Sequence, residues 1–303
     1  MVLEKTTIQK QPLGFMTFFQ QLRHRYAQFS VVERLIVILV LCFVIPFLLR
    51  TLLYLLSVPM DSFFSWFQLS SRLDLLITRP WTLLTYGFLH SSLGHIFWNM
   101  VLLYFAGRMM TNLFKPQLFI NTFFIGVLFG GLVYVFSYNF FPVFYGQTPY
   151  LLGSSAGVMA VLIYMCSYMP QQEIRLLVFN MKLMYIGLFF VILDLIQIPA
   201  GNAGGHLAHL GGALWGYLYQ KNYTRGHDIG AWFSKLIHFL NHSLFSKKPQ
   251  IRKIYKTPKA NSRKSRSQVN QDKIDAILDK ISKSGYASLT KEEKEYLFKA
   301  GKS

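Results

Sequence analysis

Charged side chains are missing from two long stretches of this 303-residue chain. Residues 116–172 contain no Asp, Glu, Lys or Arg, and residues 183–220 contain a single one, Asp194. A helix that spans a membrane needs about 20 predominantly apolar residues, so each stretch has room for two spans. With 52% hydrophobic and only 15% charged residues, the composition excludes an ordinary soluble protein. It predicts an all-α, polytopic membrane protein.

Cysteine is scarce, and no secretory signal is visible near the start of the sequence. Cys42 and Cys166 both fall inside apolar runs, so neither is expected to belong to a disulfide framework. The cysteines therefore do not indicate whether the compartment is oxidising or reducing. Residues 1–30 lack a short apolar core with a cleavage site, so we expect the first span to insert as an uncleaved anchor. The net charge of +18 does not indicate a nucleic-acid partner, because +12 of it lies in residues 221–303, after the last apolar stretch.

Six apolar segments are predicted to span the membrane. They cover about residues 35–56, 93–113, 117–138, 154–169, 183–198 and 203–220. The connection over residues 58–92 is rich in Phe and Trp and poor in charge, so we expect it to lie in the membrane interface. Lys and Arg gather in the terminal segments and in the loops after the second and fourth spans. This bias predicts that both termini are cytoplasmic.

The chain divides by composition into five parts. The predicted parts are a cytoplasmic arm (1–34), a six-helix membrane-embedded domain (35–222), an interfacial amphipathic helix (223–246), a basic disordered linker (247–271) and a small C-terminal helical hairpin (272–303). Gly285 is expected to end the first helix of the hairpin, and Thr290 with Glu293 forms a capping box for the second. The basic linker suits contact with anionic lipid.

Ser155 is the candidate nucleophile. It lies among small residues at the start of the fourth span, 14 residues before Met169. At about 1.5 Å per residue that is about 21 Å of helix, so in an apolar core about 30 Å thick Ser155 sits about 9 Å below the outer face. Free N–H groups at a helix start can stabilise the oxyanion that forms when a hydroxyl attacks a carbonyl. The neighbouring Ser154 is interpreted as a packing residue.

His209 is the candidate base, because it enters the sixth span at a similar depth. Gly212 and Gly216 follow it on the same side, and small residues four apart let two membrane helices approach closely. Close contact with the small residues of the fourth span would bring His209 to Ser155. The nearest acid is Asp194, which we expect to make a structural hydrogen bond to a neighbouring helix. A Ser–His dyad is therefore favoured over a triad.

The second span supplies two candidate oxyanion donors, His95 and Asn99. They are four residues apart and so share one helix face, where both can donate beside the Ser155 N–H. His90 is interpreted as a residue that caps the entry of the long loop into this span. Every candidate catalytic residue precedes Gln220, so the tail beyond it is expected to be dispensable for activity in vitro.

These features resemble the rhomboid family of intramembrane serine proteases, over about residues 60–220. The matching residues, in order on spans two, four and six, are His95 and Asn99, then Gly153-Ser154-Ser155, then Ala208-His209 with Gly212 and Gly216. The resemblance implies a bacterial-type, multi-pass enzyme of the cell (inner) membrane. Its substrates would be transmembrane segments of other membrane proteins, cut near their outer end after a small residue.

The resemblance also implies a role for each matching residue. Ser155 would be the nucleophile and His209 the general base. The oxyanion donors would be His95, Asn99 and the Ser155 N–H. Gly153 and His206 are accessory candidates, and no cofactor or metal is expected.

Three positions depart from the family pattern. The family often has Trp-Arg where this chain has Trp81-Thr82, an acid where it has Thr111, and Gly where it has Ala156. The first two positions relate to packing of the long first loop. They put the anchoring of that loop in question and leave the chemistry intact.

Two other functions stay open. His206 and His209 share one helical face, and with His95 or His90 they could bind zinc, although the H-E-x-x-H signature of zinc proteases is absent. A catalytically inactive, rhomboid-like binder of membrane proteins is the other alternative. The presence of both Ser155 and His209 argues against it. A soluble hydrolase is excluded because strands and helices do not alternate, and a transporter because paired broken helices are missing.

Overall fold

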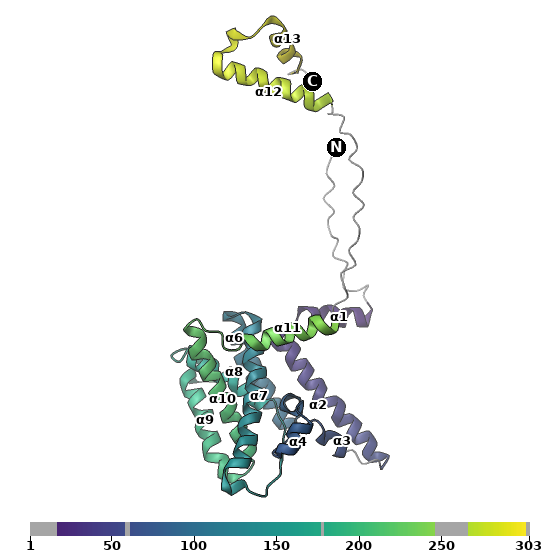
Figure 1. Ribbon diagram of the computed structural model, residues 1–303, viewed down its shortest axis with the longest axis vertical. Helices are drawn as coiled ribbons and strands as arrows, with labels where there is room; N and C mark the ends of the chain where they lie inside the picture. Colours follow the sequence, from purple (N-terminus) through teal and green to yellow (C-terminus); the bar gives the residue numbers. More distant parts are fainter. Residues whose placement is uncertain (1–16, 58–60, 177–178, 246–265, 301–303) are drawn as a thin grey trace. The chain divides into compact units, whose positions relative to one another are not determined.

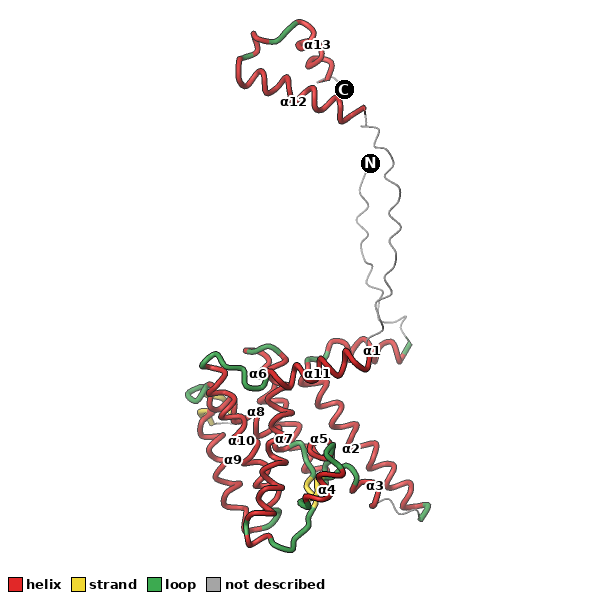
Figure 2. Tube along the Cα trace, in the orientation of Figure 1, coloured by secondary structure: helices red, strands yellow, loops and turns green. Residues whose placement is uncertain are grey.

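The computed structural model describes residues 17–57, 61–176, 179–245 and 266–300 (Figure 1). Helices dominate these residues, and the few strands form two short antiparallel pairs (Figure 2). The chain divides into two compact units, residues 1–245 and 246–303. The first unit holds the candidate catalytic residues.

All six expected spans are helical and follow the predicted order. They are α2 (Val31–Leu55), α6 (Leu93–Leu113), α7 (Pro116–Phe140), α8 (Ser155–Tyr168), α9 (Leu183–Gln197) and α10 (Ala203–Thr224). In the described part of the chain, three helical segments are long and apolar enough to cross a membrane by length and composition: α2, α7, and α9 with its extension to Ala200. Helix α8 is apolar but shorter. The predicted all-α, polytopic membrane fold is confirmed.

Side-chain hydrogen bonds fix where the helices begin. Ser30 and Glu33 form a capping box, in which the Ser30 N–H donates to Glu33 Oε2 at 2.7 Å and the Glu33 N–H donates to Ser30 Oγ at 3.3 Å. Helix α2 therefore starts at Val31, before the predicted residue 35. The arm predicted over residues 1–34 contains this first turn and a separate helix, α1 (Phe18–Gln28).

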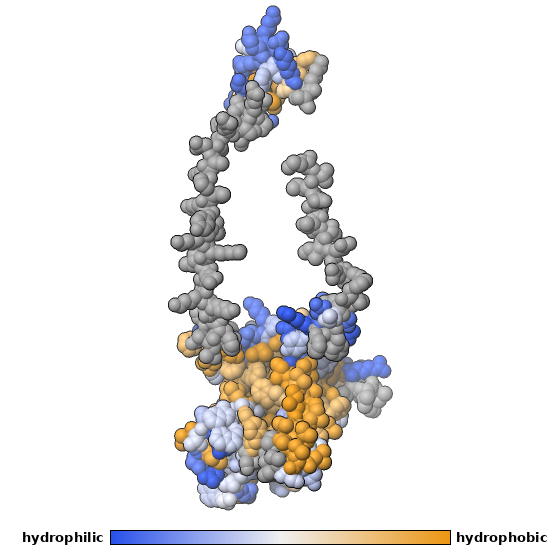
Figure 3. Space-filling view, turned by 90° about the vertical axis from the view of Figure 1, so that its right-hand side faces the viewer, coloured by the Kyte–Doolittle hydropathy of each residue, from blue (hydrophilic) through white to orange (hydrophobic). Residues whose placement is uncertain are grey.

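The outer surface of α2 is apolar along its length. Its exposed side chains include Ile38, Leu41, Ile45, Leu48, Leu52 and Leu55. Figure 3 shows a face of the first unit on which hydrophobic residues, in orange, form a continuous area. An exposed apolar area of this extent suits contact with lipid chains, because soluble proteins rarely expose such large apolar areas to water.

Helix α8 forms the centre of the bundle. Every residue from Ala156 to Cys166 is buried, and α8 packs against α6, α7, α9 and α10. A Cβ atom added at Gly212 of α10 would lie 2.0 Å from the carbonyl oxygen of Ala156, and one at Gly216 would lie 2.1 Å from that of Ala160. No side chain fits at either position, so the two glycines let α10 lie directly on α8.

The connection between α2 and α6 is folded against the bundle. It contains α3 (Asp61–Ser65), β1 (Leu69–Ser70), α4 (Leu73–Thr78), α5 (Thr82–Thr85) and the 3-10 turn η2 (Tyr86–Phe88). Strand β1 pairs antiparallel with β2 (Tyr150–Leu151), which lies shortly before Ser155. The Tyr86 hydroxyl donates to the Val127 carbonyl of α7 at 2.7 Å. This connection therefore supports the segment that leads into α8.

The loop is anchored without the arginine that the family often has at position 82. Thr82 is buried, and its hydroxyl donates to the Arg79 carbonyl at 2.7 Å. The Arg79 guanidinium lies 3.9 Å from the ring centroid of Trp66, whose ring stacks on that of Trp81. A cation over an aromatic face is attracted by the ring quadrupole. The arginine that braces the aromatic residues is thus supplied from position 79.

A small hairpin lies between α8 and α9, where the sequence indicated only a loop. Strand β3 (Glu173–Leu176) pairs antiparallel with β4 (Phe179–Lys182). Strands this short have little periodicity for a sequence pattern to reveal.

The second unit is the predicted helical hairpin, with α12 (Arg266–Ser284), η5 (Tyr286–Ser288) and α13 (Lys291–Ala300). Gly285 has φ 76° and follows the end of α12, as predicted. Thr290 and Glu293 form the predicted capping box. Because α12 begins at residue 266, residues 266–271 are helical, and the prediction that they belong to the linker is wrong. The rest of the predicted linker lies outside the described residues.

A small contact region holds α12 and α13 together. Ile277 and Leu289 are buried, and Lys280 Nζ lies 2.9 Å from both carboxylate oxygens of Glu293. The hydrogen bond from Lys280 holds the pKa of the Glu293 carboxyl below its usual value. This ion pair is exposed to solvent on one side, so its contribution to stability is small.

Helix α11 (Ala231–Phe245) packs onto the bundle, which goes beyond the interfacial position predicted for residues 223–246. Phe233 is buried, and its ring stacks on that of Phe124 of α7 at 6.0 Å between centroids. The Ser234 hydroxyl donates to Asn121 Oδ1 at 2.8 Å. Helix α10 also continues past the predicted residue 220, to Thr224.

These contacts change the expected effect of shortening the chain. We predict that truncation after Phe245 leaves the melting temperature of the bundle in detergent unchanged, because every described residue of the first unit is kept. Truncation after Gln220 removes α11 and the last turn of α10, and should lower the melting temperature by several degrees. Thermal unfolding of both truncated proteins tests this. Equal melting temperatures for the two would show that α11 adds no stability.

Candidate active site

Ser155 is the first residue of α8 and follows a strained turn. Gly153 has φ 130°, a backbone conformation that side chains rarely allow, and its N–H donates to the Tyr86 carbonyl at 2.9 Å. A Cβ atom at this glycine would lie 2.9 Å from Cε1 of His95. Glycine is therefore required both for the turn and for the close approach of the His95 ring. The N–H groups at the start of α8 have no partner within the helix and point at the turn.

Ser154 is held in place by His90. Ser154 is fully buried, and its Oγ lies 3.0 Å from Nε2 of His90. Burial and the neighbouring His95 lower the pKa of His90 to about 4, so His90 is neutral near pH 7 and its ring nitrogens are a donor and an acceptor. Ser154 thus fixes the turn to the loop before α6, in agreement with its interpretation as a packing residue. His90 does more than cap the loop, because it bridges to this turn.

His209 lies opposite Ser155. Its Nε2 is 2.7 Å from Ser155 Oγ, which is hydrogen-bond distance. His209 is on α10, three residues before Gly212, where α10 and α8 are in direct contact. The close approach that the glycine spacing predicted brings these two side chains together.

Asp194 completes a chain of hydrogen bonds through His209. Asp194 Oδ1 lies 2.8 Å from Nδ1 of His209 and 2.7 Å from Nδ1 of His206. The sequence favoured a dyad over a triad because no acid was expected beside the serine and histidine. The structure differs, because Asp194 lies within hydrogen-bond distance of His209. Asp194 does bond to a neighbouring helix as predicted, but its partners are two histidines at the candidate site.

The signal for this contact is present in the sequence. Asp194 lies close to the end of α9, and His206 lies equally close to the start of α10. The turn between them is short, with the 3-10 segment Ile198–Ala200, Gly201 at φ 134° and Asn202 in the left-handed region. Antiparallel helices joined by a short turn place residues at equal distances from it side by side. The membrane depth of Asp194 alone does not identify His206 as its partner; the short turn between the two helices does.

His95 and Asn99 lie on α6 beside the same turn. A Cβ atom at Gly153 would lie 3.0 Å from His95 Nε2, and His95 Nδ1 lies 3.1 Å from Ser91 Oγ. Asn99 is buried, and its side-chain nitrogen donates to the His95 carbonyl at 2.8 Å. An amide nitrogen carries two hydrogens, so one remains for a second acceptor. His95 is therefore directly at the turn, while Asn99 is partly engaged by its own helix.

The structure groups a different set of candidate metal ligands from the set predicted from the sequence. In the described ranges, the three groups whose ligand atoms lie within 4.8 Å of one another are Asp194, His206 and His209. The predicted zinc set instead combined the last two with His95 or His90, which do not join this group. The nitrogens that face Asp194 are within hydrogen-bond distance of its oxygen, so the carboxylate and imidazoles satisfy one another directly.

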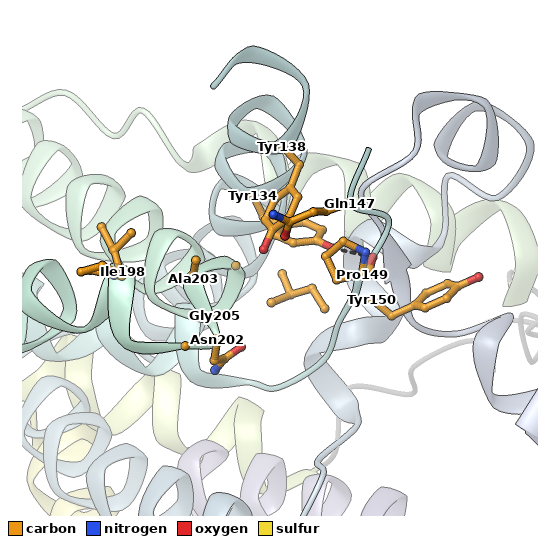
Figure 4. A pocket seen from close by; sticks show the side chains of 13 residues that line it. Tyr134, Tyr138, Gln147, Pro149, Tyr150, Ile198, Asn202, Ala203 and Gly205 are labelled. Carbon is orange, nitrogen blue, oxygen red and sulfur yellow. Dashed lines mark hydrogen bonds between the residues drawn. The ribbon is translucent and has the colours of Figure 1, made fainter. Parts of the chain in front are cut away.

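A hollow of about 320 Å³ lies near the site, next to β2 and the start of α10. Figure 4 shows Tyr134, Tyr138, Gln147 and Pro149 gathered on one side of it, with Ile198 and Ala203 on the other. The Tyr134 hydroxyl donates to the Pro149 carbonyl at 2.7 Å, which ties α7 to the segment before β2. Neither Ser155 nor His209 lines this hollow.

Comparison with known proteins gives two family matches. The Rhomboid domain family matches residues 78–225, and a family of unknown function, DUF6576, matches residues 259–302. The first match covers α6 to α10 together with the last part of the loop before α6. The second lies in the C-terminal unit.

Two curated relatives are similar to the same region. The chain is 31% identical over 147 residues to the RHOMBOID-like protein 12, mitochondrial, of Arabidopsis thaliana, which covers 45% of this chain and 44% of that protein. It is 26% identical over 160 residues to the Presenilin-associated rhomboid-like protein A, mitochondrial, of Danio rerio, which covers 47% of this chain and 37% of that protein. The match thus spans less than half the length of either relative. The domain match, these relatives and the helical membrane fold together show that residues 78–225 form a domain of the rhomboid family.

Proposed function

We propose that this protein is an intramembrane serine endopeptidase that cleaves transmembrane segments of other membrane proteins. The observation that carries the proposal is the 2.7 Å distance between Ser155 Oγ and His209 Nε2 at the start of a buried helix. Polar side chains inside apolar helices are costly and usually functional. A serine hydroxyl within hydrogen-bond reach of an imidazole is the arrangement that activates a serine nucleophile.

In the proposed reaction, His209 Nε2 takes the proton of the Ser155 hydroxyl as Ser155 Oγ attacks the carbonyl carbon of the substrate peptide bond. The tetrahedral intermediate then collapses, and His209 gives the proton to the leaving amine. This yields an acyl-enzyme on Ser155 and releases the C-terminal part of the substrate. His209 next activates a water molecule, which hydrolyses the acyl-enzyme and restores the serine.

The negative charge of the intermediate would be stabilised from two sides of the turn. The N–H groups at the start of α8, including that of Ser155, face the turn and are free of intrahelical bonds. His95, held next to Gly153, and the second amide hydrogen of Asn99 supply the side-chain donors. Donors that are already oriented cost little reorganisation when the charge forms.

We infer that the protein is a multi-pass protein of the cell membrane with both termini on the cytoplasmic side. The distribution of Lys and Arg supports this orientation, because the loops on the opposite side hold few of them. The basic residues of the tail then meet the anionic cytoplasmic leaflet. Under this orientation Ser155 lies nearer the outer face of the membrane.

The first prediction concerns the nucleophile. Ser155→Ala should abolish cleavage of a transmembrane substrate, with a loss on the order of 10⁶-fold as for other serine nucleophiles, and also abolish labelling by a fluorophosphonate. Ser154→Ala is the matched control, because its hydroxyl contacts His90 and not His209, and it should still be labelled. Wild-type protein that is folded but neither cleaves nor is labelled would support the inactive, membrane-protein-binding alternative.

The second prediction concerns the oxyanion. Asn99→Ala should lower kcat by about 10²- to 10³-fold, the usual cost of one oxyanion donor, because His95 and backbone N–H groups remain. Steady-state cleavage in proteoliposomes measures this. A wild-type kcat in the Asn99→Ala protein would remove this residue from the oxyanion site.

The third prediction separates the two histidines of α10. His209→Ala should abolish both cleavage and fluorophosphonate labelling, because only His209 reaches Ser155. His206→Ala should keep measurable activity, and a strong chelator should leave the wild-type rate unchanged. Loss of activity in the chelator together with an inactive His206→Ala protein would favour a metal site in place of the Ser–His pair.

A further inference from the structure

Asp194 is the one Asp, Glu, Lys or Arg between Leu183 and Gln220, and it is buried. A carboxylate in the apolar interior is costly unless charged or polar groups satisfy it. Here one oxygen, Oδ1, has two partners: Nδ1 of His206 at 2.7 Å and Nδ1 of His209 at 2.8 Å. The side chain is therefore held by two residues of the neighbouring helix at once.

These two contacts determine where each imidazole carries its proton. An ionised carboxylate only accepts hydrogen bonds, so both Nδ1 atoms that face it must carry hydrogen. A neutral His209 with its proton on Nδ1 has a free lone pair on Nε2. That is the atom 2.7 Å from Ser155 Oγ, and a base needs this lone pair to accept the hydroxyl proton. The opposite tautomer would present an N–H to the serine and could not act as the base.

We propose that Asp194 is a positioning residue for His209, and that His206 is the second donor that orients the Asp194 carboxylate. This inference rests on the proposed roles of Ser155 and His209. The carboxylate holds the His209 ring in the tautomer that accepts the proton, and it stabilises the imidazolium that forms when the proton has moved. His206, whose ring lies 5.9 Å from that of His209 between centroids and nearly perpendicular to it, keeps the shared oxygen between the two rings.

A purely structural role would not need this arrangement. A single hydrogen bond between α9 and α10 would satisfy the carboxylate oxygen, and any donor on α10 could supply it. Instead, Asp194 contacts the ring nitrogen of His209 that points away from Ser155, so its bond controls the nitrogen that points toward it. In serine proteases with such an acid, its replacement by an amide lowers kcat by about 10⁴-fold through the wrong tautomer.

The test uses the full-length protein with Asp194→Asn and Asp194→Ala. In Asp194→Asn the side-chain NH2 group can donate to Nδ1 of His209, which selects the tautomer that presents an N–H to Ser155. We expect kcat to fall toward about 10⁴-fold with KM unchanged, and fluorophosphonate labelling of Ser155 to slow by the same factor. In Asp194→Ala no partner selects a tautomer, and kcat should fall by about 10²- to 10⁴-fold.

Asp228→Asn is the matched control. This acid also accepts a hydrogen bond within the first unit, from the Tyr219 hydroxyl at 2.6 Å, but it does not contact the candidate site. Its replacement should affect the melting temperature alone, with wild-type kcat. An Asp194→Asn protein with wild-type kcat, or one whose loss is matched by Asp228→Asn, would overturn the positioning role.

The protonation of His209 is measured independently of proteolysis by ¹⁵N NMR of histidine-labelled protein, with the signal assigned by its loss in His209→Ala. We expect the Nδ1–H form in wild type, the Nε2–H form in Asp194→Asn, and a mixture of tautomers in Asp194→Ala. An Nε2–H form in wild type would overturn the inference. Wild-type protein with the Nδ1–H form that is never labelled at Ser155 would instead show that the proposed function fails while the positioning geometry stands.

Discussion

The contact between α8 and α10 is the constraint on which the rest of the site depends. Lipid chains are as apolar as the helices, so no hydrophobic force drives helices together in a membrane, and van der Waals packing of small residues must do it. Gly212 and Gly216 place α10 directly on the carbonyls of Ala156 and Ala160, where even a methyl group would clash. The same contact sets the distance from His209 to Ser155. The close packing of α8 and α10 is therefore also what brings His209 to Ser155.

The start of α8 needs a second support, because its backbone is irregular where lipid would not satisfy it. Irregular backbone at membrane depth is tolerated where protein or water covers it. Here the Gly153 N–H bonds to Tyr86, β2 pairs with β1, and the Ser154 hydroxyl contacts His90, so all three contacts come from the loop before α6. A hollow of about 420 Å³ lies between this loop and α2, lined in part by His90 and Arg50. The long first loop is thus part of the framework that holds Ser155.

The sequence predicted the helices and the Ser155–His209 contact because both follow from local patterns. Apolar length fixes the spans, and glycine spacing marks the face where two helices meet. What it missed depends on contacts between distant segments: the β1–β2 pair, and the docking of Phe233 of α11 on α7. The sequence indicated the depth of Asp194 but not its two histidine partners. The position of a residue along a helix does not say which way its side chain faces around the helix axis. Helix ends shifted where capping side chains such as Ser30 begin a helix earlier than its apolar run.

The scarcity of charge in the spans has a direct link to the site. A lone carboxylate, imidazole or hydroxyl at this depth would be costly, but each of these groups satisfies the next: Asp194 accepts from two histidines, and His209 contacts Ser155. A fully satisfied polar network in a low-dielectric interior is stronger and more rigid than the same bonds in water. Removing Asp194 would leave Nδ1 of both histidines without its partner. The single acid in an otherwise uncharged stretch is therefore best explained by the histidines that it holds.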